Sequence, residues 1–383
     1  MHIIVAPDSF KGSLSAIEVA NAMARGIISV FPEAQVTKVP IADGGEGTVE
    51  ALVTATGGRM MYEKVMGPLG DTVDACWGIL GDHETGVIEM AAASGLLLIP
   101  KERRDPRMAT TYGTGQLIKI ALDQGIRKLI IGLGGSATND GGVGMARALG
   151  VKFLDEANHE LPDGGAALKD LTEINTEGMD PRLAEATILV ACDVDNPLYG
   201  PRGASAVYGP QKGATPEIIN DLDQALKHYA DIAKQTTGRD VAERPGAGAA
   251  GGLGAGLLLF TPSQLRPGVQ IVLEATGFAE KVKQADLVIT GEGCTDSQTA
   301  HGKAPVGVAK IAQHYNVPTL CLSGSLGSGC EDVLQQGIGG VMSIIARPMT
   351  LDECMGSADE LVYEATARLC RLVRVGIAMA NAK

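Results

Sequence analysis

Residues 128–142 read KLIIGLGGSATNDGG, and this stretch decides the fold class of the 383-residue chain. The apolar run that follows Lys128 predicts a buried strand of a parallel sheet. The glycine-rich loop comes directly after that strand, where open α/β sheets bind their ligands. Glycine lets backbone N–H groups turn toward a bound anion and allows close approach. The stretch therefore predicts an α/β protein with a ligand-binding loop at the end of a parallel strand.

Four more loops are rich in glycine, acids or hydroxyls, and most of them also follow an apolar run. They are residues 40–48 (PIADGGEGT), 192–197 (CDVDNP), 245–254 (PGAGAAGGLG) and 290–298 (TGEGCTDSQ). Carboxylates in such loops are suited to a divalent cation, which a phosphate group can share. Glycine-rich loops that also carry acids therefore favour phosphoryl transfer.

The composition excludes several classes of partner. Hydrophobic residues make up 45% of the chain and charged residues 20%, which is typical of a compact globular protein. A formal net charge of −13 argues against nucleic acid or an anionic membrane surface as partner. Seven cysteines without a CxxC pair predict reduced thiols and a cytoplasmic location. The N-terminus does not resemble a signal peptide, and we expect no membrane span.

The order of predicted elements indicates two domains. Strand and helix alternate at the N-terminus and again from residue 285, whereas residues 59–89 form short runs typical of an antiparallel meander. The simplest architecture is a doubly wound domain of residues 1–65 plus 285–383, with a second α/β domain of residues 66–284 inserted. Capping signals at Ser15 and Thr215 predict helix starts, and one long helix is expected over residues 351–380.

Candidate ligand-binding residues follow the first two strands. Asp8, Ser9 and Lys11 come after the first strand, where Lys11 can neutralise a phosphate and Ser9 can donate to one. A solvated turn is an equally good interpretation of that triplet. Asp43 and Glu46 follow the second strand, although an acid there can simply complement a helix dipole.

The loop at Gly132 contains GxGxxA through Ala137, so a dinucleotide site has to be considered. The polar cluster after it is unlike that fingerprint, and we reject NAD. The chain also lacks a Walker A loop. Glu292 and Asp296 can share a cation, with Ser297 and Gln298 orienting a ligand, and Lys303 can contact phosphate from a helix start.

Residues 192–197 raise a competing function. A strand that ends in Asp193-x-Asp195 is used by aspartyl-phosphate phosphatases of the haloacid dehalogenase type. Here the motif lies in the middle of the chain and Pro197 occupies its Thr/Val position. In a kinase, Asp193 would instead hold metal or accept a hydroxyl proton.

Several stretches together resemble the glycerate kinase family. They are residues 6–16, 42–48, 89–96, 110–115, 134–142, 209–214, 245–252, 289–293, 296–298 and 302–303. The resemblance implies ATP-dependent phosphorylation of D-glycerate with Mg²⁺, 2-phosphoglycerate as product, and a flavodoxin-like domain with an inserted α/β domain around a cleft. A 3-phosphoglycerate-forming kinase stays open, as does a homo-oligomer. The family commonly has Arg-Ile where Cys294-Thr295 stands here.

The resulting site assignment has three classes. Catalytic roles are expected for Lys11 and for Asp193 or Asp296, one of which would accept the hydroxyl proton. Metal ligation is expected from Asp43, Asp140 and Glu292. Substrate or phosphate binding is expected from Asp8, Ser9, Gly44, Gly45, Thr111, Gly135, Ser136, Thr138, Asn139, Gln211, Lys212, Gly248, Gly251, Ser297, Gln298 and Lys303.

Overall fold

The computed structural model describes residues 1–382, which form two compact units. The first, here called the terminal unit, contains residues 1–43, 50–57 and the chain from Val269 onward. The second, the inserted unit, contains residues 44–49 and 58–268. Strand β3 (Arg59–Met66) therefore belongs to the inserted unit, and α10 (Phe278–Val282) to the terminal unit.

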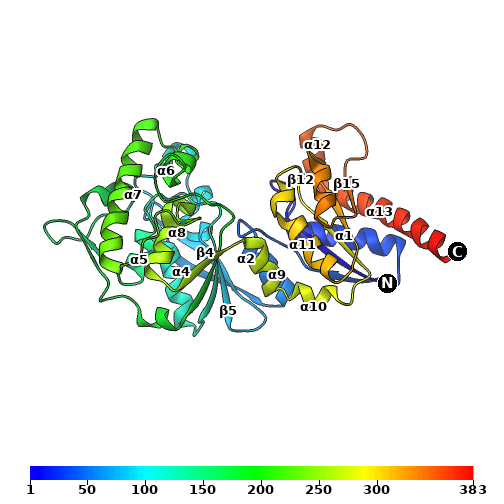
Figure 1. The fold of residues 1–383 in the computed structure, drawn as a ribbon, viewed down its shortest axis with the longest axis horizontal. Coiled ribbons are helices and arrows are strands. Elements are labelled where there is room, and N and C mark those ends of the chain that lie inside the picture. Colours follow the sequence, from blue (N-terminus) through cyan, green and yellow to red (C-terminus); the bar gives the residue numbers. More distant parts are fainter. Residues whose placement is uncertain (383) are drawn as a thin grey trace. The chain divides into compact units, whose positions relative to one another are not determined.

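The terminal unit is built on a five-stranded parallel sheet (Figure 1). Its strands lie in the order β15 (Gly340–Ser343), β13 (Thr319–Ser323), β11 (Leu287–Gly291), β1 (His2–Pro7) and β2 (Gln35–Lys38). Numbered along this unit, the order is 2-1-3-4-5 read from the β2 edge, which is the flavodoxin-like arrangement. The predicted doubly wound fold, made from both ends of the chain, is confirmed.

Helices cover both faces of this sheet. Alternate residues of a strand point to opposite faces. Leu322 packs in a core with α1 (Ala16–Val30) and α13 (Ala358–Asn381), whereas Cys321 packs with α11 (Ala304–His314). The predicted start of α1 is confirmed, because Ser15 and Glu18 form a capping box.

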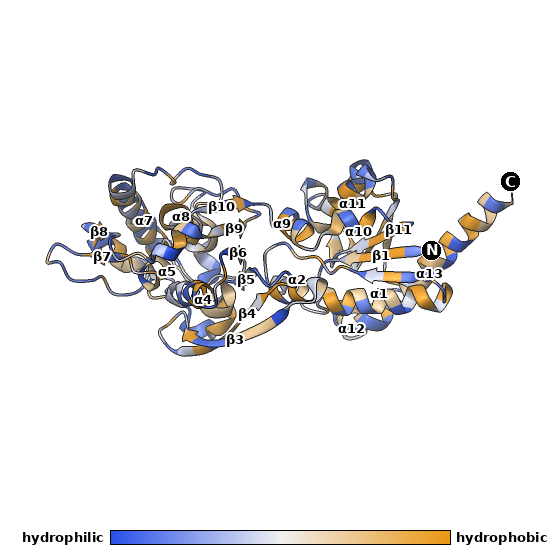
Figure 2. Cartoon of the chain, turned by 90° about the horizontal axis from the view of Figure 1, so that it is seen from below, coloured by the Kyte–Doolittle hydropathy of each residue, from blue (hydrophilic) through white to orange (hydrophobic). Residues whose placement is uncertain are grey.

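The prediction of one helix over residues 351–380 is wrong. The structure has α12 (Leu351–Gly356) and then α13, with Ser357 between them at φ −115°. Gly356 precedes the break, and glycine is a poor helix former. The last turns of α13 extend beyond the rest of the terminal unit and leave Leu372, Val375 and Met379 exposed (Figure 2).

The inserted unit contains a six-stranded mixed sheet. The order is β10 (Ser263–Arg266), β9 (Thr187–Ala191), β6 (Lys128–Gly132), β5 (Thr85–Glu89), β4 (Thr72–Ile79) and β3. The first four are parallel, and β4 runs antiparallel to both of its neighbours. The expected meander over residues 59–89 is confirmed, and the strand that opens at Lys128 lies inside this sheet.

Helices of the inserted unit include α4 (Tyr112–Asp123), α5 (Val143–Ala148), α7 (Pro216–Thr237) and α8 (Ala249–Phe260). Thr215 caps α7 and Pro216 is its first residue, as predicted. Helix α8 is kinked, because Ala250, Gly251 and Gly252 all have positive φ. The shorter helices and strands of the chain are α2 (Thr48–Thr56), α3 (Ala91–Ser94), α6 (Ala204–Tyr208), α9 (Gly268–Ala275), β7 (Lys152–Leu154), β8 (Glu173–Asn175), β12 (Cys294–Thr295) and β14 (Ser325–Leu326).

Within residues 1–382, every helix is too short or too polar to span a bilayer.

Candidate active site

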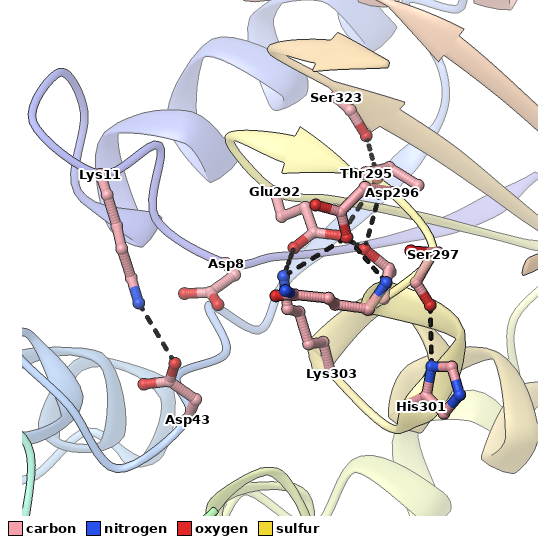
Figure 3. A network of polar contacts seen from close by, with 12 residues as sticks. Asp8, Lys11, Asp43, Glu292, Thr295, Asp296, Ser297, His301, Lys303 and Ser323 are labelled. Atoms are coloured by element: carbon pink, nitrogen blue, oxygen red, sulfur yellow. Dashed lines mark hydrogen bonds and ion pairs between the residues drawn. The ribbon is translucent and has the colours of Figure 1, made fainter. Parts of the chain in front are cut away.

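Acidic residues gather at the carboxyl end of the terminal sheet. Strands β1 and β11 end in register, with Pro7 beside Gly291, so Asp8 and Glu292 leave the sheet at the same level. The Asp8 N–H also donates to the Gly291 carbonyl at 2.8 Å. Burial, followed by the charge of Asp43 and a smaller effect of Glu292, raises the pKa of Asp8 to about 7. The three carboxylates therefore make a region of concentrated negative charge (Figure 3).

Lys11 lies next to this cluster, on the side of Asp43. Its Nζ lies 3.4 Å from Asp43 Oδ2, and 79% of the side chain is exposed. Asp43 raises the pKa of Lys11, with a further contribution from Asp8. The ammonium group is thus charged, accessible and held at the rim of the acidic cluster.

Glu292 is held by hydroxyl groups. The Thr295 and Thr299 hydroxyls both donate to Oε1, at 3.1 and 2.7 Å. Thr295 also shares a hydrogen bond of 2.7 Å with Ser323. Burial raises the pKa of Glu292 in spite of these bonds. The hydroxyls fix Oε1, which leaves Oε2 facing Lys303 (Figure 3).

Lys303 joins the two acids of the same loop. Its Nζ lies 4.0 Å from Glu292 Oε2 and 3.8 Å from Asp296 Oδ1. Asp296 also accepts a hydrogen bond from the Gln298 N–H at 2.9 Å. Ser297 and Gln298 are exposed. The structure thus brings together the loop residues that the sequence predicts as one group.

Asp140, predicted as a metal ligand, lies in the inserted unit and is 1% exposed. Its Oδ2 accepts hydrogen bonds from the N–H and hydroxyl of Thr111, both at 2.8 Å, and from the Gly144 N–H at 3.2 Å. Its Oδ1 accepts one from the Gly142 N–H at 3.1 Å. These bonds give the carboxylate an internal role at the start of α5, and its metal role stays a prediction.

Much of the loop at Gly132 is buried in the same way. Thr138 and Asn139 have no exposed surface, and Lys212 is 1% exposed. Lys212 Nζ donates to the Thr138 carbonyl at 2.6 Å, and burial lowers the pKa of Lys212 to about 7. Lys212 therefore supports the loop from inside, whereas Gly135 is its exposed part.

The glycines of α8 pack against this loop. A Cβ at Gly251 would lie 1.9 Å from the Thr138 carbonyl oxygen, and one at Gly248 would lie 2.2 Å from the Pro197 carbonyl oxygen. The Gly141 N–H donates to the Gly251 carbonyl at 3.0 Å. Close backbone packing thus accounts for these glycines, and their predicted contact with a ligand stays untested.

Asp193 is exposed and lies after β9, at the carboxyl end of the inserted sheet. Its Oδ1 accepts the Gly268 N–H at 2.9 Å, where α9 begins. Asp195 and Gln211 are exposed as well. Asp193 is therefore accessible, but it already caps a helix.

Within residues 1–382, no three His, Cys, Asp or Glu side chains are grouped as a metal site. Mg²⁺ does not require such a cage, since one or two carboxylates plus substrate phosphates usually hold it. Asp43 and Glu292 are carboxylates of this kind, and each lies beside a lysine: Lys11 Nζ is 3.4 Å from Asp43 Oδ2, and Lys303 Nζ is 4.0 Å from Glu292 Oε2.

Comparison with known proteins identifies the family. Residues 3–374 match the model of the glycerate kinase family. The chain belongs to the glycerate kinase family. It is 52% identical to a glycerate kinase of Halalkalibacterium halodurans over 367 residues, which is 96% of this chain and 97% of the relative. It is 49% identical to a glycerate 2-kinase of Escherichia coli over 377 residues, which is 98% of this chain and 99% of the relative.

A solved structure agrees with this assignment. The crystal structure of a proposed glycerate kinase 2 from Salmonella typhimurium LT2 is similar with a TM-score of 0.89 and 48% identity, covering 98% of this chain and 99% of that one. The chain is thus a kinase, and its family implies ATP as co-substrate and a small-molecule acceptor. The phosphatase interpretation of Asp193 and Asp195 is therefore not retained.

Three residues at or near the candidate loops make contacts that the sequence does not predict. Thr295 and Thr299 bind Glu292, and Glu89 binds the start of α2. Glu89 opens one of the stretches that resemble the family, so a signal for it was present. Hydroxyl-bearing residues near an acid give no comparable signal, because their partners depend on the fold of the loop.

Proposed function

We propose that this kinase transfers the γ-phosphoryl group of ATP to the 2-hydroxyl of D-glycerate and forms 2-phosphoglycerate. The support for the position is the E. coli relative, a glycerate 2-kinase with 49% identity across nearly the whole chain. Formation of the 3-phosphate is the alternative that the residues themselves leave open.

The acidic cluster at Asp8 carries the chemical part of the proposal. Burial, followed by the charge of Asp43 and a smaller effect of Glu292, raises the pKa of Asp8 to about 7, and a perturbed carboxyl group among further acids is typical of a functional site. We propose Asp43 and Glu292 as the ligands of Mg²⁺. When bound, Mg²⁺ would supply positive charge to the phosphate oxygens during transfer.

The proposed reaction is a direct in-line transfer. The substrate hydroxyl oxygen forms a bond to the γ-phosphorus while the bond from that phosphorus to the ADP oxygen breaks. A carboxylate, Asp193 or Asp296, accepts the hydroxyl proton and later releases it to solvent. Lys11 and Lys303, which lie beside the acidic residues, are suited to phosphate oxygens.

Backbone groups of the inserted unit complete the proposal. Gly135 is exposed and Gly45 is partly exposed, and both belong to glycine loops that meet at the carboxyl end of the sheet. Backbone N–H groups of such loops bind phosphate or carboxylate groups. We assign the loops to the anionic groups of the two substrates, without dividing them between ATP and glycerate.

An assay for ADP tests the activity. ADP release should require D-glycerate and a divalent cation together, and EDTA should abolish it. Release of ADP at the same rate without D-glycerate would contradict the proposal. A cytoplasmic location remains a prediction, which fractionation of cells would test.

A further inference from the structure

Glu89 ends strand β5, and its carboxylate binds the first turn of α2. Its Oε1 accepts the Val49 N–H at 2.8 Å. Burial raises the pKa of Glu89, and the charge of Glu46 raises it further. Hydrogen bonds from the backbone N–H groups of Gly47 and Thr48 lower the pKa, but by less than burial raises it. A partly buried carboxylate thus occupies the start of a nine-residue helix.

The loop that leads into this helix, residues 44–49, packs on the inserted sheet backbone against backbone. A Cβ at Gly132 would lie 2.3 Å from the Gly44 carbonyl oxygen. A Cβ at Gly134 would lie 2.7 Å from the Gly45 Cα. No side chain separates the two loops at these points, so a small shift of either loop changes how both present their N–H groups.

One pair of residues connects the two contacts. Glu89 and Gly132 are partners in the register between β5 and β6. The strand pair that places Gly132 against Gly44 therefore also places the Glu89 carboxylate at the start of α2. Loop 44–49 is held at both of its ends by the same two strands.

We propose that Glu89 is a positioning residue, whose carboxylate holds loop 44–49 against loop 132–136 in the arrangement that binds the anionic groups of the substrates. This inference rests on the proposed function of the two loops. Because the Glu89 carboxylate occupies the N–H groups at the start of α2, the substrate phosphates would bind other N–H groups of these two loops.

The test compares Glu89 with a matched carboxylate at the other end of the same strand. Asp82 accepts hydrogen bonds from the N–H groups of Glu84 and Thr85, at 3.0 and 2.9 Å, and from the Thr85 hydroxyl at 2.7 Å. Both residues bind backbone N–H groups beside β5, but Asp82 lies in the turn between β4 and β5. The variants are Glu89→Ala, Glu89→Gln, Asp82→Ala and Asp82→Asn.

We expect Glu89→Ala to raise the KM of ATP or D-glycerate at least about tenfold, since a charge-assisted contact is lost. Glu89→Gln keeps an acceptor oxygen and should show a smaller rise. Acetate, added as a small carboxylate, should lower the raised KM of Glu89→Ala but leave that of Glu89→Gln unchanged. The Asp82 variants should lower the melting temperature and keep wild-type kinetic constants.

Two outcomes would overturn the inference. If Glu89→Gln and Glu89→Ala keep the wild-type KM and kcat while the wild-type protein forms ADP with D-glycerate, Glu89 is not a positioning residue and the proposed function stands. If the wild-type protein forms no D-glycerate-dependent ADP, the proposed function fails, and this inference fails with it.

Discussion

Substitution of Asp8 by Asn should stabilise the metal-free protein at alkaline pH. The pKa of Asp8 is raised from 3.8 to about 7 by burial and by Asp43, so the folded state binds more protons than the unfolded state between these values. Wild-type stability therefore falls as the pH rises from 3.8 toward 7. Asn carries no charge and retains the oxygen that accepts the Ser9 N–H, a bond of 2.6 Å in the wild type.

The size of the effect follows from the shift. Between about pH 5 and about pH 8, the folded state keeps the Asp8 proton over about two pH units in which the unfolded state has lost it. The resulting loss of wild-type stability has an upper bound of about 3 kcal/mol. Asp8 is partly exposed, so solvent screening reduces this to about 1–2 kcal/mol. The unfolding entropy of 383 residues corresponds to about 1 °C per kcal/mol, so the melting temperature of Asp8→Asn should gain about 1–2 °C on the wild type across this range.

Scanning calorimetry in EDTA measures this gain. Asp82→Asn is the matched control. Hydrogen bonds from Thr85 and Glu84 outweigh desolvation and lower the pKa of Asp82, so the charge of Asp82 stabilises the folded state above about pH 3.8. The control should lose stability at about pH 8 relative to the wild type. A melting-temperature difference between Asp8→Asn and wild type that does not change with pH would refute the electrostatic account of the cluster.

Three further predictions concern the base, the buried lysine and α8. Asp193→Asn and Asp296→Asn are each expected to lower kcat with an unchanged melting temperature if that residue accepts the proton, and wild-type kcat in both would exclude the two as the base. The pKa of Lys212 is lowered to about 7 from 10.5, so raising the pH from about 7 to about 10 should stabilise the wild type relative to Lys212→Met in thermal unfolding; equal pH dependence of both proteins would contradict this. Gly251→Ala should cost about 2–4 kcal/mol in unfolding free energy, because the position has positive φ and its Cβ would meet the Thr138 carbonyl. A wild-type melting temperature for that variant would show that the close packing is not required.

The sequence predicts the sheets better than the loops. Continuous apolar runs such as Leu129–Ile131 predict buried parallel strands, because only those strands are covered on both faces. The register between β1 and β11 then brings Asp8 and Glu292 to one edge, which the sequence predicts only as a general rule for such sheets.

Burial inside the loops could not be predicted from the sequence. The structure places Thr138 and Asn139 in the interior because the kinked start of α8, distant in the sequence, packs on them through Gly251. A polar residue in a glycine-rich loop looks the same in the sequence whether it faces a ligand or a backbone carbonyl. Lys212 is an example, since it donates to Thr138.

The break before α13 shows a second limit. Residues 351–380 have the apolar spacing of one helix, and Gly356 alone gives little reason to divide it, because glycine within a helix costs only about 1 kcal/mol. After the break, α13 lies along α1, and Val362 and Ala365 are buried in the core that contains both helices.

The position of the transferred phosphoryl group distinguishes a 2-kinase from a 3-kinase. The protein is incubated with Mg-ATP and D-glycerate, and the product is coupled to enolase alone, which forms phosphoenolpyruvate from 2-phosphoglycerate. We predict phosphoenolpyruvate formation without delay and in proportion to ADP. ADP release with phosphoenolpyruvate appearing only after phosphoglycerate mutase is added would show that the product is the 3-phosphate and that the kinase does not act on the 2-hydroxyl.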